Sequence, residues 1–473
     1  MKSSLETPTF TQDETWLSKF KSQPFSSIPS NEWYGVKDLK LGETEAERER
    51  SARLSELAAE ARKVAMAEFI ASDTLEEPKI NYPNLVEAKI KEAETVYLRL
   101  LGNAALIDSG VVSDFRYEQA AKKLAELYRH LEVIRSHNLS GVKKVTSEAR
   151  AAELSSEIFG TPEKNAFNQI LSNLRVRAQK LAPQSQIAAE LLDLTNDVAY
   201  DKTASFELKE ETLSTIRGDL TNLFPNIESQ LVGDDVGDIP AEDSVEYFQK
   251  FIDFMQMDGW KATLNNGRAA DANASEQEVG IGRNRDAFTP LRLNAIMVHE
   301  VIGHGLRAFN ASRQSESHKQ SPTPGSLAFE EGFATGLEQV ITGEKRIAGE
   351  QYYLSLGLQM GLDANGETRN FRHVYEILWR RLALDAIEKG NEPNIDKCKT
   401  EAYTQCLRTT RGGTMDTRDI SYFEGAKKAY TWLNQVAQLP EEQRLDQLRF
   451  VLSGRFDPTN PTDTALFTNV DNQ

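Results

Sequence analysis

Apolar residues recur at helical spacing through the first half of the chain. In the segment ETEAERERSARLSELAAEARKVAMAEFI, Leu57, Ala61 and Val64 follow one another at steps of four and three residues. This spacing places them on one face of an α-helix. Further helical patterns follow, up to the stretch VGDDVGDIPAEDS, whose Gly, Asp and Pro residues are typical of a linker or a long loop.

These patterns divide the chain into three parts. Residues 1–41 are rich in Ser, Pro and Thr, a composition that favours an extension without a core of its own. We predict a helical region over residues 42–238 and a second domain over residues 239–473.

The second domain contains the clearest strand pattern. The segments WKATLN and EVGIGR carry β-type residues, and Asn266-Gly267 between them is a turn signal, so the sequence predicts a paired hairpin. Gly280 and Gly282 lie on one face of the second strand, where the missing side chains allow another backbone to approach closely. An ordinary irregular loop explains these glycines equally well. With helices before and after it, this small sheet predicts an α+β fold that is mostly helical.

A helix carries the most informative motif, HEVIGH. Thr289 and Pro290 are the residues expected at its N-cap and first turn. His299 and His304 bracket Glu300 but stand five residues apart, one more than in the H-E-x-x-H helix of zinc proteases. An isolated histidine on such an apolar helix is more often a hydrogen-bonded core residue than a metal ligand.

The five-residue spacing restricts how this pair can act. In an α-helix the two side chains point about 140° apart and cannot bind one ion. A π-type turn brings residues five apart onto one face, and such turns concentrate at functional sites. We therefore predict a bulged or broken helix between His299 and His304, with Gly303 and Gly305 easing the backbone change.

A catalytic zinc site takes three protein ligands and leaves one position open. The candidate for the third ligand is SLAFEEGFATGLEQV, a helical pattern with adjacent carboxylates at Glu330 and Glu331. Glu338 lies two helical turns further on, near the face of Glu331. Periodicity does not choose between Glu330 and Glu331, and most such carboxylate pairs form a solvated face.

Net charge and amino-acid composition make some classes of binding partner less plausible than others. The net charge of −17 weighs against a nucleic acid, which needs a concentrated basic surface, and against an anionic membrane. Two cysteines are too few for a disulfide framework. The chain shows no signal peptide and no apolar run of membrane-spanning length, so we expect a cytoplasmic protein.

Four elements of the second domain resemble a known family, the metallopeptidases with an H-E-x-x-x-H motif followed by [QE]-E-G-L-A, which include the microtubule-associated tyrosine carboxypeptidases. The elements here are AFTPLRLNAIMVHE, HEVIGH, EEGFA and RGGTMDTRDISYFEG, in the family's order. Phe333 replaces the family's Leu. The resemblance implies a zincin-like catalytic domain with one zinc ion per chain, bound by His299, His304 and Glu331, and Glu300 as catalytic base.

The same resemblance implies a peptidase acting on the C-terminal tail of a peptide or protein. Such an enzyme needs a donor for the developing oxyanion, for which Tyr422 and Arg411 are candidates. It also needs a cation for the terminal carboxylate, for which Arg408, Arg411 and Arg418 are alternatives. The strand edge near Val279–Arg283 is a further candidate, for pairing with the substrate backbone.

Two other functions fit the same residues. One is an aminopeptidase or endopeptidase, and the other is a metal-binding regulatory protein without turnover. A carboxylate beside a ligand, as at Glu300, is of little use to a purely structural site, which favours the enzyme. The net charge of −17 disfavours the acidic tails of tubulin as the substrate, and the oligomeric state stays open.

Overall fold

The computed structural model describes residues 45–80, 141–196, 207–233, 235–265, 267, 269–315, 319–323, 325–344, 347–363, 365–410 and 415–468. The extension predicted for residues 1–41 therefore lies outside the described residues. The helices before the sheet are α3 (Glu45–Ala71), α6 (Gly141–Phe159), α7 (Lys164–Leu181), η2 (Ala182–Gln184), α8 (Gln186–Leu194), α9 (Glu210–Leu223), η3 (Ile227–Gln230) and α10 (Ala241–Phe254).

The strands are β1 (Lys261–Asn265), β2 (Asp271–Asn273) and β3 (Glu278–Gly282). After the sheet come α11 (Pro290–Met297), η4 (Val298–Leu306), α12 (Arg307–Ser312), α13 (Ser326–Thr342), α14 (Glu350–Gln359), α15 (Phe371–Glu388), α16 (Ile395–Thr410), η5 (Thr417–Asp419), α17 (Ile420–Val436), α18 (Glu441–Leu452) and α19 (Pro461–Thr468). The prediction of a mostly helical α+β fold with a small sheet is confirmed.

The sheet differs from the predicted hairpin. Its strand order is β1-β3-β2, with β1 parallel and β2 antiparallel to β3. The reversal before β3 is made by Asn273, whose side chain accepts hydrogen bonds from the backbone N–H groups of Ser275 and Glu276, an Asx-type turn. The predicted hairpin between β1 and β3 was wrong because the short β2 takes the antiparallel position.

The sheet also corrects the predicted edge. β3 pairs on both sides, so Val279–Arg283 is not a free edge, and β2 lies at the border of the sheet instead. Gly280 does meet a close neighbour: a Cβ atom there would lie 2.8 Å from the side-chain nitrogen of Asn265. The close approach is made by a side chain of β1 rather than by another backbone.

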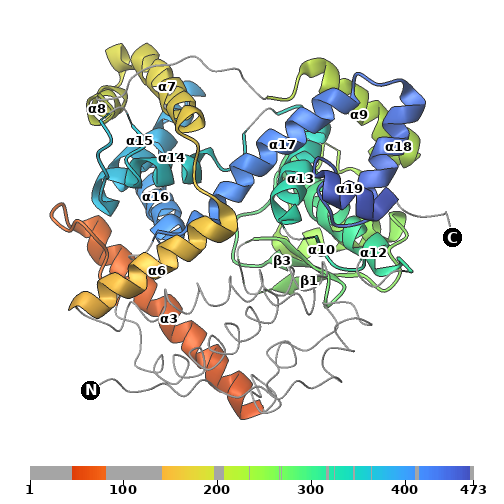
Figure 1. Ribbon diagram of the computed structural model, residues 1–473, viewed down its shortest axis with the longest axis horizontal. Helices are drawn as coiled ribbons and strands as arrows, with labels where there is room; N and C mark the ends of the chain where they lie inside the picture. The colour runs from red at the N-terminus through yellow and green to blue at the C-terminus, as the bar shows by residue number, and fades with distance from the viewer. Residues whose placement is uncertain are drawn as a thin grey trace.

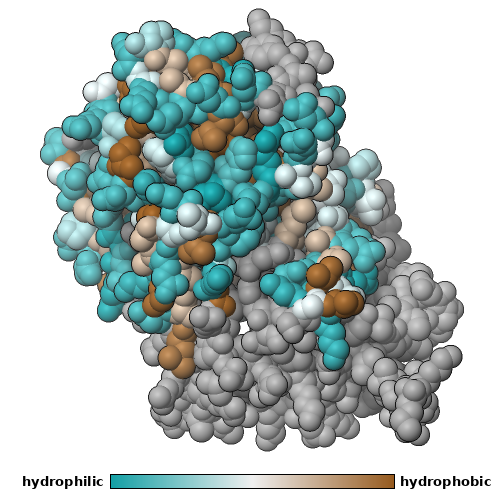
Figure 2. Space-filling view, turned by 90° about the vertical axis from the view of Figure 1, so that its left-hand side faces the viewer, coloured by the Kyte–Doolittle hydropathy of each residue, from teal (hydrophilic) through white to brown (hydrophobic). Residues whose placement is uncertain are grey.

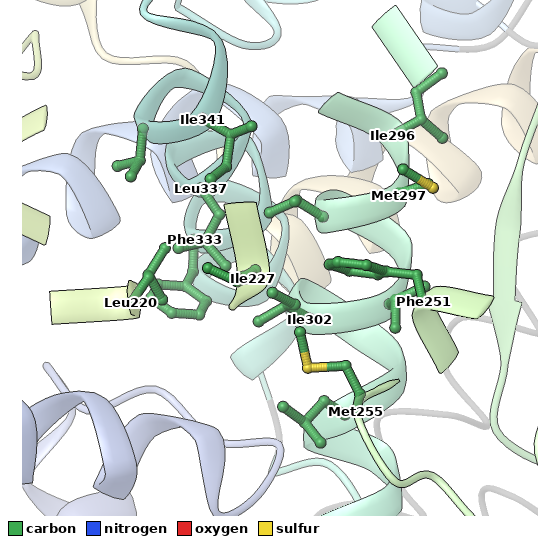
Figure 3. Close-up of a cluster of buried hydrophobic side chains, with 14 of the residues drawn as sticks. Leu220, Ile227, Phe251, Met255, Ile296, Met297, Ile302, Phe333, Leu337 and Ile341 are labelled. Carbon is green, nitrogen blue, oxygen red and sulfur yellow. The ribbon is translucent and has the colours of Figure 1, made fainter. Parts of the chain in front are cut away.

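The buried apolar residues form two clusters. One contains side chains of α9, α10, β3, α11, η4, α13 and α17, and Figure 3 shows several of them converging around η4 and α13. The other contains side chains of α7, α8, α14, α15 and α16. Ile420 and Phe423 at the start of α17 belong to the second cluster, whereas Ala426 and Leu433 further along belong to the first. α17 therefore links the two groups of helices, as Figure 1 shows.

The position of α13 is fixed by a close crossing with α17. A Cβ atom on Gly332 would lie 2.0 Å from the carbonyl oxygen of Gly425, and one on Gly425 would lie 1.7 Å from that of Ala328. Only glycine allows two helices to approach this closely at both positions. The crossing holds the carboxylate-bearing face of α13 at a fixed distance from α17.

The outer face is mostly polar where it can be seen. On the face shown in Figure 2, hydrophilic residues predominate and hydrophobic ones occur in small groups. Within the described ranges, no helix is both long and apolar enough to cross a membrane.

Candidate metal centre

A π-helix carries both motif histidines. Thr289 caps α11 by accepting a hydrogen bond from the N–H of Arg292, and Pro290 is its first residue, as predicted. The helix then widens into the π-helix η4 (Val298–Leu306). Residues five apart share a face in this geometry, and the Nε2 atoms of His299 and His304 lie 3.2 Å apart. The predicted local widening of the helix is confirmed.

Gly303 contributes to this arrangement through packing. Its φ angle does not lie in the left-handed region, so backbone freedom is not what the position requires. A Cβ atom there would lie 2.4 Å from the Cβ of Ala334 in α13. The missing side chain lets η4 lie directly against α13.

This contact brings a carboxylate of α13 to the two imidazoles. The Oε2 atom of Glu331 lies 3.9 Å from Nε2 of His299 and 3.9 Å from Nε2 of His304. One ligand atom from each of these three residues lies within 4.8 Å of the others, so the group could hold a metal ion. Of the two adjacent carboxylates, Glu331 is the one that joins this group.

Two other carboxylates of α13 contact the far sides of the histidine rings. Oε1 of Glu330 lies 2.9 Å from Nδ1 of His304, and Oε1 of Glu338 lies 2.6 Å from Nδ1 of His299. The contact of Glu330 is a hydrogen bond, which fixes the His304 ring and leaves its Nε2 for a metal ion. Nδ1 of His299 lies close to Glu338 but is not aligned for a hydrogen bond with a described residue. The sequence placed Glu338 near the face of Glu331 but did not show this contact.

An arginine supports each of these carboxylates. Arg455 donates to both oxygens of Glu330, with N–O distances of 3.0 to 3.2 Å. Arg292 donates to Oε2 of Glu338 at 3.1 Å. Burial opposes ionisation of Glu330, but Arg455 and the hydrogen bond with His304 outweigh it and hold the pKa of Glu330 well below its usual value.

Glu300 lies beside the histidines and is only 8% exposed. It lines the same cleft as His299, His304 and Glu331. Burial raises the pKa of Glu300, the two histidines oppose that shift, and the charge of Glu331 adds to it. A carboxylate with a raised pKa accepts a proton more readily near neutral pH.

The cleft has a volume of about 670 Å³, and helices of both apolar clusters line it. Tyr422 of α17 is in its wall, and burial raises the pKa of Tyr422 to about 12, so its hydroxyl is a hydrogen-bond donor at neutral pH. Arg408 also lines it, but donates to both oxygens of Asp419 at 2.8 and 3.0 Å.

The other arginine candidates have different positions. Arg418 is not among the residues that line the cleft. Arg411 lies outside the described residues. Patterns within one segment give no signal for residues that only the fold brings into the cleft. The sequence therefore did not predict five of the residues that line it: Asp271, Arg285, Arg292, Tyr352 and Arg455.

Comparison with known families identifies the chain. The model of one family, the microtubule-associated tyrosine carboxypeptidases, matches residues 196–462. The chain belongs to this family. It is therefore a member of a family of carboxypeptidase-type peptidases, and the match covers the sheet, η4, α13 and α17. No curated protein and no solved structure matches the chain.

Proposed function

We propose that the chain is a zinc-dependent carboxypeptidase that removes C-terminal residues from a peptide or protein, with one zinc ion per chain. One observation carries the proposal: the π-helix brings two imidazole Nε2 atoms to 3.2 Å, with Oε2 of Glu331 3.9 Å from each. Two imidazoles and a carboxylate are a ligand set that catalytic zinc takes, with one position left open.

The surrounding residues fit the same ion. Both Nδ1 atoms face carboxylates, so the two Nε2 atoms are the ones available as ligands. When bound, zinc supplies Lewis acidity toward the scissile carbonyl and lowers the pKa of water to about 7.

The chain's own residues would move the protons. In the proposed reaction Glu300 accepts a proton from the attacking water and passes it to the leaving amine nitrogen. Its burial in the cleft wall, which raises its pKa, supports this assignment. The protonated hydroxyl of Tyr422 donates a hydrogen bond to the oxyanion that develops on the carbonyl.

The substrate is a C-terminal tail. The description of the family names a terminal tyrosine and microtubules, and a peptide ending in tyrosine is the first substrate to test. The net charge of −17 favours a tail that is not strongly acidic, because a like-charged partner is repelled.

The decisive experiment replaces Glu300. Glu300→Gln should lower the hydrolysis rate of peptides with free C-termini by about 10²- to 10⁴-fold, the usual contribution of a general base. Its zinc content should match that of the wild type, whereas His304→Ala should lose the ion. Glu246→Gln is a matched control, because Glu246 is exposed on α10 and does not line the cleft.

Two results would refute the proposal. One is wild-type protein that holds no zinc at equilibrium with the ion. The other is a Glu300→Gln variant that hydrolyses peptides at the rate of the wild type. Amidated peptides separate this activity from that of an endopeptidase, which would cleave them equally well.

A further inference from the structure

Among the described residues, four arginines line the cleft, and three of them have a carboxylate partner. Arg292 pairs with Glu338, Arg455 with Glu330 and Arg408 with Asp419. The fourth, Arg285, makes no ion pair with any residue in the described part of the chain. Its Nε atom is buried and has no hydrogen-bond partner there. The Arg285 side chain is partly buried, and no carboxylate among the described residues offsets the loss of water around its Nε atom.

The carboxylate of the neighbouring residue Asp286 does not form an ion pair with Arg285. Oδ2 of Asp286 lies 3.5 Å from Nζ of Lys397, and the Asp286 side chain is 87% exposed. Burial and the nearby charge of Arg292 both lower the pKa of Arg285, opposed only in part by Asp286. Within the described residues, Asp286 therefore does not neutralise Arg285.

The guanidinium is also held in a fixed orientation. Its central carbon lies 3.7 Å from the centre of the Phe288 ring, a stacked cation–π contact. Phe288 is 1% exposed, and its backbone exchanges two hydrogen bonds of 2.8 Å with Ile239. With one face on a fixed ring and Nε buried, the two terminal nitrogens of Arg285 are the atoms left for a planar anion.

We propose that Arg285 binds the terminal α-carboxylate of the peptide substrate. The proposal rests on the carboxypeptidase function proposed above and adds the group that distinguishes a chain end from an internal peptide bond. A carboxylate matches the guanidinium fork with two parallel hydrogen bonds. Of the arginines predicted for this role, Arg408 is engaged by Asp419, whereas Arg285 lines the same cleft and makes no ion pair with a described residue.

The test measures binding rather than turnover. The full-length Glu300→Gln protein is titrated with two pools of labelled tetrapeptides that vary in the last residue, one with free C-terminal carboxylates and one amidated. The acid pool should bind more tightly. Adding Arg285→Gln should weaken acid binding by about 10- to 100-fold, the value of a charge-assisted bidentate pair, and leave amide binding unchanged.

Two further variants complete the design. Arg285→Lys keeps the charge without the fork and should recover part of the preference for the acid pool. Arg313→Gln is the matched control, because Arg313 also stacks on a phenylalanine, 4.3 Å from the ring centre of Phe309, but does not line the cleft. Arg313→Gln should keep the full preference, and thermal unfolding checks that each variant is folded.

Clear outcomes would overturn the assignment. The assignment is wrong if the Glu300→Gln protein binds the acid and amide pools equally well, or binds neither of them measurably. An undiminished acid preference in either Arg285 variant would also overturn it. These results are separate from a failure of the proposed function, which would appear as hydrolysis that survives Glu300→Gln or as absence of zinc.

Discussion

A carboxylate and then an arginine stand behind each of the two histidines, at two different depths. Behind His304, Glu330 is 0% exposed, and its partner Arg455 has 23% of its side chain exposed. Behind His299, Glu338 is 6% exposed and Arg292 is 47% exposed. We refer to these as the deep half and the shallow half of the site.

The two halves also differ in what they connect. Glu330 in the deep half lies 3.9 Å from the fully buried guanidinium of Arg307, which donates to the carbonyls of Val451, Gly454 and Phe456. The deep half therefore ties the site to the C-terminal helices. Water screens the pair in the shallow half, so its main effect is to orient one ring. We therefore expect the deep half to contribute mainly to the stability of the fold, and the shallow half mainly to the metal affinity of His299.

The largest expected effect comes from neutralising the deep carboxylate. Glu330→Gln leaves the fully buried Arg307 and the partly exposed Arg455 without this counter-charge, and breaking a buried pair in this way costs about 3–5 kcal/mol. Urea unfolding of the metal-free protein measures the loss. Glu246→Gln, on the exposed face of α10, should change stability by less than about 0.5 kcal/mol. Equal unfolding midpoints for the two variants would show that the deep half does not stabilise the fold.

The second effect concerns the contact between η4 and α13 beside His304. Gly303→Ala places a methyl group 2.4 Å from the Cβ of Ala334, and overpacking of this kind costs about 1–3 kcal/mol. Gly305→Ala is the comparison, since its nearest neighbour is the end of the flexible Met257 side chain at 3.0 Å. We expect Gly303→Ala to lower the unfolding temperature and the zinc affinity more than Gly305→Ala does. The reverse order would mean that the π-helix does not depend on close packing at Gly303.

The sequence predicted the parts of the site that depend on one segment. The five-residue spacing of His299 and His304 required a widened turn, and η4 has it. The sequence did not choose between Glu330 and Glu331. Both are carboxylates on the same turn of a helix, and only the packing of that helix decides which of them faces the histidines. The resemblance to a family implied Glu331, and the distances to the imidazoles agree with that assignment.

The parts that depend on tertiary packing could not be predicted. Arg455 lies 125 residues beyond Glu330, and no periodicity relates the two. The strand order was missed for a similar reason, because the three-residue strand β2 is too short to leave a pattern. Arg285 was missed because only the fold shows which cleft arginines already have a carboxylate.

A smaller effect on the ligands tests the shallow half. Glu338→Gln removes the charge that faces Nδ1 of His299, and such a change typically lowers metal affinity by about 10- to 100-fold. Zinc titration against a competing chelator measures the affinity. The unfolding midpoint should move far less than in Glu330→Gln. A variant that keeps the zinc affinity of the wild type would show that Glu338 does not act on the ion through His299.

The smallest effect separates the two arginines by their response to salt. Because nearly half of the Arg292 side chain is exposed, its pair with Glu338 should contribute about 0–1 kcal/mol, and salt should screen it. Arg292→Gln should therefore lower stability slightly at low ionic strength and hardly at all in about 1 M salt, where the Debye length is about 3 Å. Arg455→Gln should lower the free energy of unfolding by more than Arg292→Gln does, at low and at high ionic strength, because salt does not reach the buried carboxylate of Glu330. The two variants could instead lose the same stability and respond to salt in the same way. Depth would then not distinguish the two halves. The greater contribution of the deep half to the stability of the fold would have to come from the hydrogen bonds of Arg307 alone.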